Sequence, residues 1–177
     1  MDFSTSKTEN LFLQMIREFA EKEVKPLAAA VDEEERFPEE TVKKMAALGM
    51  MGIPFPKEYG GAGGNNQLYS MAVEELSRVC ATTGVIVSAH TSLCASPIYE
   101  FGNEEQRRKY LPRLCSGEWI GAFGLTEPNA GTDASAQQTM AVKEGEHYVL
   151  NGSKIFITNA VYAHVYIVMA MTDKAQG

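Results

Sequence analysis

Residues 123–133 read FGLTEPNAGTD, and they follow the point near Gly117 where the sequence changes from helix-forming to strand-forming patterns. The overlapping run GAFGL is strand-like, whereas Pro128, Asn129 and Gly131 force the backbone to turn. Amides that point one way in such a turn form a nest for anions. Spacing alone leaves two interpretations open: a solvated loop with capping hydroxyls, or part of an anion-binding site.

Amphipathic helices are predicted before this segment. The first begins at a capping region, residues 4–6, and its apolar residues recur at helical spacing. Pro26 is expected to end it. Pro38 is well placed to begin the next helix, and Gly49 to stop it. The glycine- and proline-rich run 53–66 is predicted to be a loop.

Three further helices are expected after that loop. One covers about 67–80 and has a single apolar stripe. The next, 83–101, is apolar or small almost all round, which is typical of a buried helix, and its His90 is interpreted as a satisfied core histidine. Asn103 and Gln106 form a capping-box pattern that begins the last helix.

Strand-forming runs follow the helices. Turn residues at 144–146 and 151–152 indicate hairpins between these runs. The predicted strands are 148–150, 154–158 and 166–171. The sequence therefore predicts an α+β fold, with an all-α domain at 1–117 followed by antiparallel β structure at 118–177.

The composition is that of a soluble globular protein, with 45% hydrophobic and 22% charged residues. A net charge of −7 argues against a protein that coats nucleic acid. We expect neither a membrane span, because no apolar run approaches roughly 20 residues, nor a signal peptide. Cys80, Cys94 and Cys115 match no zinc or redox spacing, so free thiols in a reducing cytoplasm are expected.

Two long segments resemble the paired signature of the acyl-CoA dehydrogenases: FGLTEPNAGTDAS from Phe123 and LNGSKIFITNA from Leu150. In that family an aromatic-x-x-[TS]-E-P-x-x-G-[ST]-D segment precedes an N-G-x-K-x-[WF]-I-T-N segment. KEYGGAGG (57–64), AVEELSRV (72–79) and FGNEEQRRKYLP (101–112) are similar to the family's N-terminal helical domain. The resemblance covers essentially the whole chain and is strongest to bacterial short-chain (butyryl-CoA) dehydrogenases. It implies that residues 118–177 begin a barrel-like middle domain.

The resemblance also implies that the cofactor is FAD and that eight residues contact it. Phe123, Leu125 and Thr126 would lie along the isoalloxazine ring, Gly131 and Thr132 beside the pyrophosphate, and Phe156, Ile157 and Thr158 against the other side of the ring. Thr132 would also touch the pantetheine arm of the thioester substrate. Phe123 and Phe156 stand where many relatives have Tyr and Trp, so a side-chain hydrogen bond at either position is lost. No metal site is expected.

The implied reaction is α,β-dehydrogenation of a short-chain acyl-CoA, butyryl-CoA to crotonyl-CoA, with electrons passed to an electron-transferring flavoprotein. In the family, a glutamate in a C-terminal helical bundle removes the α-proton. We expect that bundle to be absent, the chain to contain no catalytic residue and to be inactive alone, and the full-length family member to be a homotetramer. Two alternatives stay open: a non-catalytic flavin- or CoA-binding or assembly module, and an oxygen-using relative such as an acyl-CoA oxidase.

Overall fold

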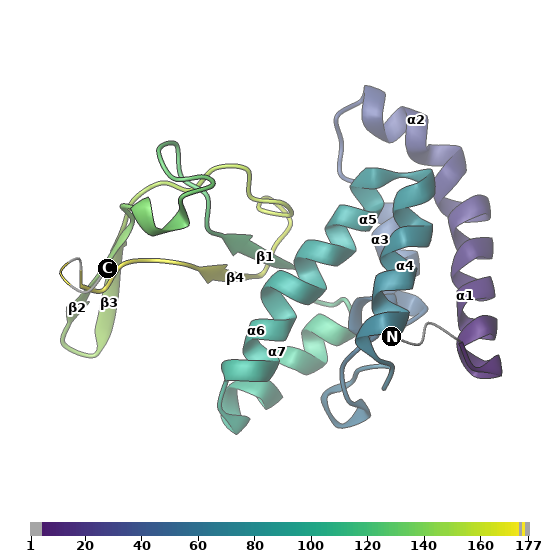
Figure 1. Ribbon diagram of the computed structural model, residues 1–177, viewed down its shortest axis with the longest axis horizontal. Coiled ribbons are helices and arrows are strands. Elements are labelled where there is room, and N and C mark those ends of the chain that lie inside the picture. The colour runs from purple at the N-terminus through teal and green to yellow at the C-terminus, as the bar shows by residue number, and fades with distance from the viewer. Residues whose placement is uncertain (1–4, 174, 176–177) are drawn as a thin grey trace.

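The computed structural model describes residues 5–173 and 175, so the predicted capping position Ser4 lies outside the described part of the chain. The helices gather on one side of the molecule and the strands on the other (Figure 1). The helices are α1 (Lys7–Phe19), α2 (Lys25–Glu33), α3 (Glu39–Ala47), α4 (Asn66–Val79), α5 (Ala81–Ser88), α6 (Ser96–Phe101) and α7 (Glu104–Cys115). The strands are β1 (Gly121–Gly124), β2 (Met140–Glu144), β3 (His147–Asn151) and β4 (Val165–Val168). The described part of the chain thus confirms the α+β prediction.

Capping side chains begin the helices where the sequence predicted them. The Ser6 hydroxyl accepts from the Glu9 amide over 3.2 Å, and the Glu9 carboxylate accepts from the Ser6 amide over 2.8 Å. Asn103 and Gln106 make the same reciprocal pair at the start of α7. These bonds satisfy amides that have no partner within the helix. Gly49 follows α3 at a φ of 73°, a left-handed conformation that suits glycine and ends the helix as predicted.

Pro26 does not end the first helix, contrary to the prediction. A π-helical segment, Ala20–Val24, links α1 to α2, and Pro26 lies in the first turn of α2. The amide of Lys25 donates to the carbonyl of Ala20, five residues back. This wider turn changes the hydrogen-bonding register just before the proline, which cannot donate an amide bond. The chain therefore stays helical through a residue that usually stops a helix.

A second π-helical segment, Ala89–Ala95, joins α5 to α6 into one helical run. The prediction that this run is buried all round is only partly right. Ile86, Val87 and Cys94 are buried, but Val85 is 49% and Leu93 is 42% exposed. The run therefore has one apolar face that the described residues leave uncovered. It lies between the other helices and the strands (Figure 1).

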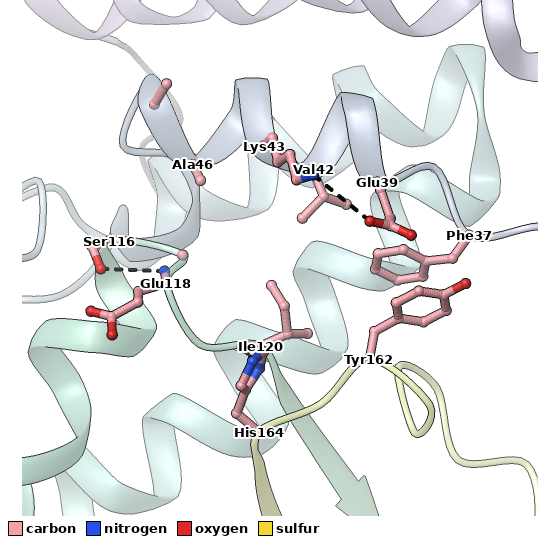
Figure 2. A pocket seen from close by; sticks show the side chains of 12 residues that line it. Phe37, Glu39, Val42, Lys43, Ala46, Ser116, Glu118, Ile120, Tyr162 and His164 are labelled. Atoms are coloured by element: carbon pink, nitrogen blue, oxygen red, sulfur yellow. Dashed lines mark hydrogen bonds and ion pairs between the residues drawn. The ribbon is translucent and has the colours of Figure 1, made fainter.

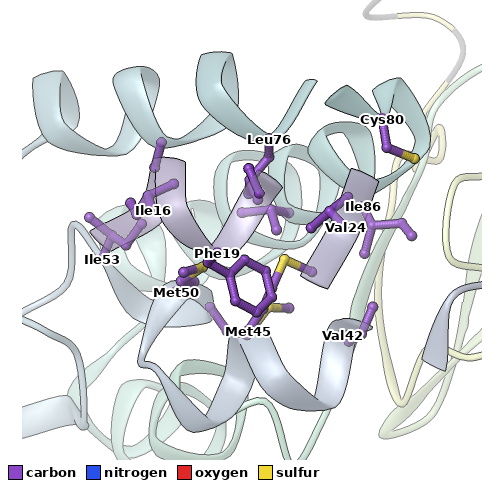
Figure 3. Close-up of a cluster of buried hydrophobic side chains, with 14 of the residues drawn as sticks. Ile16, Phe19, Val24, Val42, Met45, Met50, Ile53, Leu76, Cys80 and Ile86 are labelled. Carbon is purple, nitrogen blue, oxygen red and sulfur yellow. The ribbon is translucent and has the colours of Figure 1, made fainter. Parts of the chain in front are cut away.

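The helices enclose a close-packed apolar core. Figure 3 shows Phe19, Met45 and Met50 together in this cluster, where methionine fills the space between helices. The three cysteines are free and buried, as expected, and burial raises the pKa of the Cys94 thiol to about 11 and that of Cys115 to about 12. None of the described helices has the length and apolar character that crossing a membrane requires.

The strands form two separate pairs. β2 and β3 make the predicted antiparallel hairpin, with Gly145 at a φ of 64° in the turn. β1 and β4 are parallel, with Gly121 opposite Val165, so the antiparallel prediction holds for one pair only. A parallel pair needs a long connection, here the hairpin and both signature segments. The predicted domain division after residue 117 falls between α7 and β1 and stays a prediction.

Candidate functional site

The segment after β1 makes a tight turn whose two ends hydrogen-bond to each other. The Glu127 amide donates to the Ala130 carbonyl over 3.0 Å, and the Ala130 amide donates back to the Glu127 carbonyl over 3.1 Å. Pro128 and Asn129 are exposed at the tip, whereas Glu127 and Ala130 are buried. The turn predicted from proline and asparagine is therefore confirmed, and it draws the Glu127 side chain into the protein.

The Glu127 carboxylate is the centre of a buried polar network. It accepts from the amides of Gln138 and Thr139 over 2.6 and 2.9 Å, and from the Lys154 ammonium over 2.7 Å. The bond from Lys154, followed by the donors at Thr139 and Gln138, lowers the pKa of Glu127 to about 2. The carboxylate is therefore ionised at any physiological pH and is a poor proton acceptor.

Lys154 ties the two signature segments together. Besides Glu127, its ammonium donates to the Leu125 carbonyl over 2.8 Å and to the Gln137 side-chain oxygen over 3.2 Å. The next amide, of Ile155, donates to the Thr126 carbonyl over 2.9 Å. Segments that are about 30 residues apart in sequence thus meet side by side.

The second signature segment is not a strand, so the predicted strand at 154–158 and the hairpin turn at 151–152 are both wrong. Phe156 has a φ of 57° and Asn159 a φ of 69°, and neither value is compatible with an extended ladder. Phe156 is 88% exposed. A bulky aromatic residue in the left-handed region is a strained conformation, which usually persists at functional sites.

Asn159 and His90 together hold the peptide groups on either side of Gly121 at the start of β1. The Gly121 amide donates to His90 Nδ1 over 3.0 Å, and the Gly121 carbonyl accepts from Asn159 Nδ2 over 3.0 Å. His90 Nε2 donates to the Leu114 carbonyl over 3.1 Å, and Asn159 Nδ2 also donates to the Ile86 carbonyl. His90 is therefore the satisfied core histidine that the sequence predicted, and burial lowers its pKa to about 4.

The eight residues predicted to contact FAD do not all open onto one pocket. Leu125 and Thr126 lie half-buried beside Lys154, and Gly131 and Thr132 are exposed beyond the turn. Phe123 lines a pocket of about 580 Å³ between α6, α7 and the β1–β4 pair. Thr158 lines another, of about 440 Å³, with the exposed face of α5. Phe156 and Ile157 lie next to Thr158 in the chain, and the described residues thus form open walls rather than an enclosed site.

These residues suit the FAD that the resemblance implies. A Cβ placed on Gly131 would meet nothing within 4 Å, so there is room for a bulky group beside the exposed Thr132. The exposed Phe156 ring offers an apolar surface to a flat aromatic ligand. The buried Oδ1 of Asn159 has no hydrogen-bond partner among the described residues. Buried acceptors of this kind are rare and commonly mark a place where a ligand or water belongs.

A further pocket, of about 550 Å³, shares Phe37 with the pocket that Thr158 lines (Figure 2). Its wall includes Phe37 stacked on Tyr162, with ring centroids 4.1 Å apart and planes at 15°. Val42 of α3 and Ile120 line it from opposite sides in Figure 2, and His164 also lines it. The pocket contains none of the eight predicted FAD contacts.

Three residues central to the geometry were not predicted to have a functional role. Lys154 and Asn159 lie inside the second signature segment, which was the only signal that could have drawn attention to them. Gln137 lies in an ordinary polar run, and its contact with Lys154 depends on the folded chain. Such non-local bonds leave no periodic pattern in the sequence.

Two family models match the chain. The model for the acyl-CoA dehydrogenase N-terminal domain matches residues 6–118, and the model for the middle domain matches residues 122–177. The short-chain specific acyl-CoA dehydrogenase of Clostridium acetobutylicum is 66% identical over 177 residues, which are 100% of this chain and 47% of that protein. The chain thus spans about half the length of the curated relatives it matches.

Solved structures agree in fold. Butyryl-CoA dehydrogenase from Megasphaera elsdenii matches with a TM-score of 0.94 and 46% identity, over 100% of this chain and 47% of that one. A structure described as the electron transferring flavoprotein of Acidaminococcus fermentans matches with a TM-score of 0.95 and 52% identity, over 100% and 47%. A Bacillus anthracis acyl-CoA dehydrogenase complexed with FAD matches with a TM-score of 0.88 and 37% identity, over 94% and 30%. The chain belongs to the acyl-CoA dehydrogenase family.

Proposed function

We propose that this chain forms the helical domain and one wall of the FAD site of a short-chain acyl-CoA dehydrogenase. The observation that carries the proposal is the buried Glu127–Lys154 pair, which brings the two signature segments together at the positions where the cofactor contacts were predicted. The high identity to a short-chain specific relative supports the substrate class. The FAD-containing structure of a relative supports the cofactor.

The proposed contacts would hold different parts of the cofactor. When bound at these residues, FAD would supply the hydride acceptor for dehydrogenation of the acyl thioester. Hydroxyls and amides at Thr126 and Thr158 would donate to its polar edge, and Thr132 would donate to the pyrophosphate and to the pantetheine arm. Phe123, Leu125, Phe156 and Ile157 would exclude water from the ring, and Gly131 would leave space beside the pyrophosphate.

We propose that neither Glu127 nor the helical glutamates Glu75 and Glu104 are the general base of the reaction. Glu127 is fixed by Lys154 with its pKa lowered to about 2, far below the range useful for proton abstraction at neutral pH. Glu75 is paired with Arg17 and Arg78, which lower its pKa. Glu104 accepts from the Tyr59 hydroxyl over 2.8 Å and pairs with Arg108. We therefore expect the base to come from outside these helices, and the chain to be inactive alone.

The partners follow from the same proposal. We infer a short-chain acyl-CoA substrate, an electron-transferring flavoprotein as electron acceptor, a homotetramer and a cytoplasmic location. The match to the Acidaminococcus fermentans electron transferring flavoprotein structure supports the acceptor.

The test compares this chain with the full-length product of its gene. Butyryl-CoA oxidation is followed with an artificial electron acceptor, and oxygen uptake is measured separately. We expect turnover by the full-length protein, little oxygen uptake, and no turnover by residues 1–177 alone. Turnover by the chain alone would contradict the position of the base. Oxygen as the preferred acceptor would favour the oxidase alternative, and FAD binding without turnover by the full-length protein would favour the non-catalytic one.

A further inference from the structure

We propose that Lys154 is a positioning residue of the flavin site, whose ammonium group sets the spacing between residues 125–127 and residues 155–158. The inference rests on the proposed function. The Lys154 ammonium bonds to the Leu125 carbonyl and to the Glu127 carboxylate. The proposed cofactor contacts at 125–126 and 156–158 are close to these groups along the chain.

All three N–H donors of the ammonium are used. They reach the Leu125 carbonyl, the Glu127 carboxylate and the Gln137 side chain over 2.8, 2.7 and 3.2 Å. The side chains of Lys154 and Glu127 are only 11% and 5% exposed, so water competes weakly for these bonds. A three-donor group with three fixed acceptors has one favourable orientation, and it therefore fixes three segments relative to one another.

The bonds also set the direction of the backbone that is proposed to contact the cofactor. A trans peptide group points its carbonyl and its amide in opposite directions. The bond from Lys154 to the Leu125 carbonyl therefore aims the Thr126 amide away from the ammonium. In the next peptide group, the Ile155 amide holds the Thr126 carbonyl, and the Glu127 amide closes the turn onto Ala130. The orientations of the 125–126 and 126–127 peptide groups thus depend on the bonds made by residues 154 and 155.

The charge of the pair matters as well as its shape. Glu127 and Lys154 neutralise each other, so together they place no net charge beside the site. Removing the ammonium alone leaves a buried carboxylate held only by amides, which is a costly arrangement. An uncompensated negative charge also opposes reduction of a nearby flavin, because reduction adds electron density. Loss of Lys154 is therefore expected to lower the flavin reduction potential.

The experiment uses the full-length gene product with FAD and butyryl-CoA. The variants are Lys154→Met, Glu127→Gln and the double variant, with Lys143→Met, at an exposed position of β2, as the matched control. FAD affinity, the reduction potential of the bound flavin, and kcat and KM are measured. We expect Lys154→Met to bind FAD about tenfold more weakly, to have a lower potential, and to lose roughly 100-fold in kcat with little change in KM. The double variant should bind FAD no worse than Lys154→Met, because neither charge is then left alone.

The possible outcomes separate failure of the proposed function from failure of the positioning role. If the unsubstituted protein binds no FAD, the proposed function fails and this inference fails with it. If it binds FAD but Lys154→Met matches Lys143→Met in affinity, potential and kcat, positioning is wrong while the proposed function stands. Loss of thermal stability alone, with those three values unchanged, shows a merely structural role and also overturns the inference.

A milder variant covers the case in which Lys154→Met does not fold. Gln137→Leu removes one acceptor of the ammonium and leaves the charge pair intact. Like Lys154→Met, it should lower kcat, but only by about threefold, because only one hydrogen bond of the ammonium is lost. An unchanged kcat in folded Gln137→Leu, together with unchanged FAD affinity, would contradict a positioning role.

Discussion

The helical region and the β2–β3 hairpin of this chain differ in how much apolar packing stabilises them. Among the helices, Leu76 and Met45 are completely buried in a continuous apolar cluster. In the strand region every residue of β3 is exposed, and Leu150 is 53% accessible. The β1–β4 pair does pack on the helices, since Ala122 is buried and Val165 and Ile167 contact a second apolar cluster around Leu111. The bonds of Glu127, Lys154 and Asn159 join the segments between the strands. The helical region thus has a continuous apolar core, whereas the β2–β3 hairpin leaves most of its side chains uncovered by the described residues.

The two regions meet at Gly121, whose amide and carbonyl are held by His90 and Asn159. Gly121 also packs closely, because a Cβ there would lie 2.5 Å from the Cβ of Cys94. The candidate site begins two residues later at Phe123. The buried hydrogen bonds at Gly121 therefore fix the position at which the exposed candidate site begins.

The largest expected effect comes from removing apolar volume in the helical core. Leu76→Ala should lower the free energy of unfolding of the chain by about 3 to 4 kcal/mol, because it leaves a cavity in a fully buried site. Leu150→Ala, the same substitution on β3, should change it by less than about 0.5 kcal/mol because that side chain is exposed. Urea unfolding of both variants measures the difference. Similar losses in the two would show that the strand region has an apolar core of its own.

A slightly smaller loss of folding stability is expected when the pH is lowered, because His90, which bonds to the Gly121 amide, is then protonated on unfolding. His90 has a pKa of about 4 in the folded chain, against an ordinary value of 6.5, so the folded state favours the neutral ring. Its contribution is complete above about pH 6.5 and is lost as the pH falls towards 4, with a total loss of roughly 3 kcal/mol. Urea unfolding at several pH values between 7.5 and 4 measures the slope.

The control for that prediction is His90→Gln, which keeps one acceptor for the Gly121 amide and one donor for the Leu114 carbonyl but does not titrate. The free energy of unfolding of this variant should fall less steeply with decreasing pH than that of the unsubstituted chain. The difference in slope should correspond to about one proton fewer bound on unfolding. Equal slopes in the two proteins would show that His90 does not bind the extra proton on unfolding.

Local signals predicted the helical region well. The capping pairs at Ser6 and Asn103, the proline before α3 and the left-handed Gly49 all act within a few residues of themselves, so their consequences can be seen in the sequence. Pro26 was misjudged because the π-helical turn that accommodates it depends on the packing of the whole helix. The uncovered face at Val85 and Leu93 was missed because composition shows apolar character and not what covers it.

The strand region was predicted less well because its decisive contacts are non-local. The composition of residues 154–158 favours a strand, but the bond from Ile155 to Thr126 and the left-handed Phe156 exclude one. The parallel pairing of β1 with β4 joins residues more than 40 apart, so no turn signal announces it. The signature segments located the candidate site correctly at 123–133 and 154–159, yet the role of Lys154 emerged only when its three acceptors were seen together.

Hydrogen–deuterium exchange of the full-length gene product, with and without FAD, tests most directly whether the two linked segments form the flavin wall. We predict slower exchange with FAD in peptides covering residues 125–133 and 154–159, and unchanged exchange around Val42 and Ala46 at the pocket of Figure 2. Protection at that pocket, with no change in the two linked segments, would contradict the proposed site.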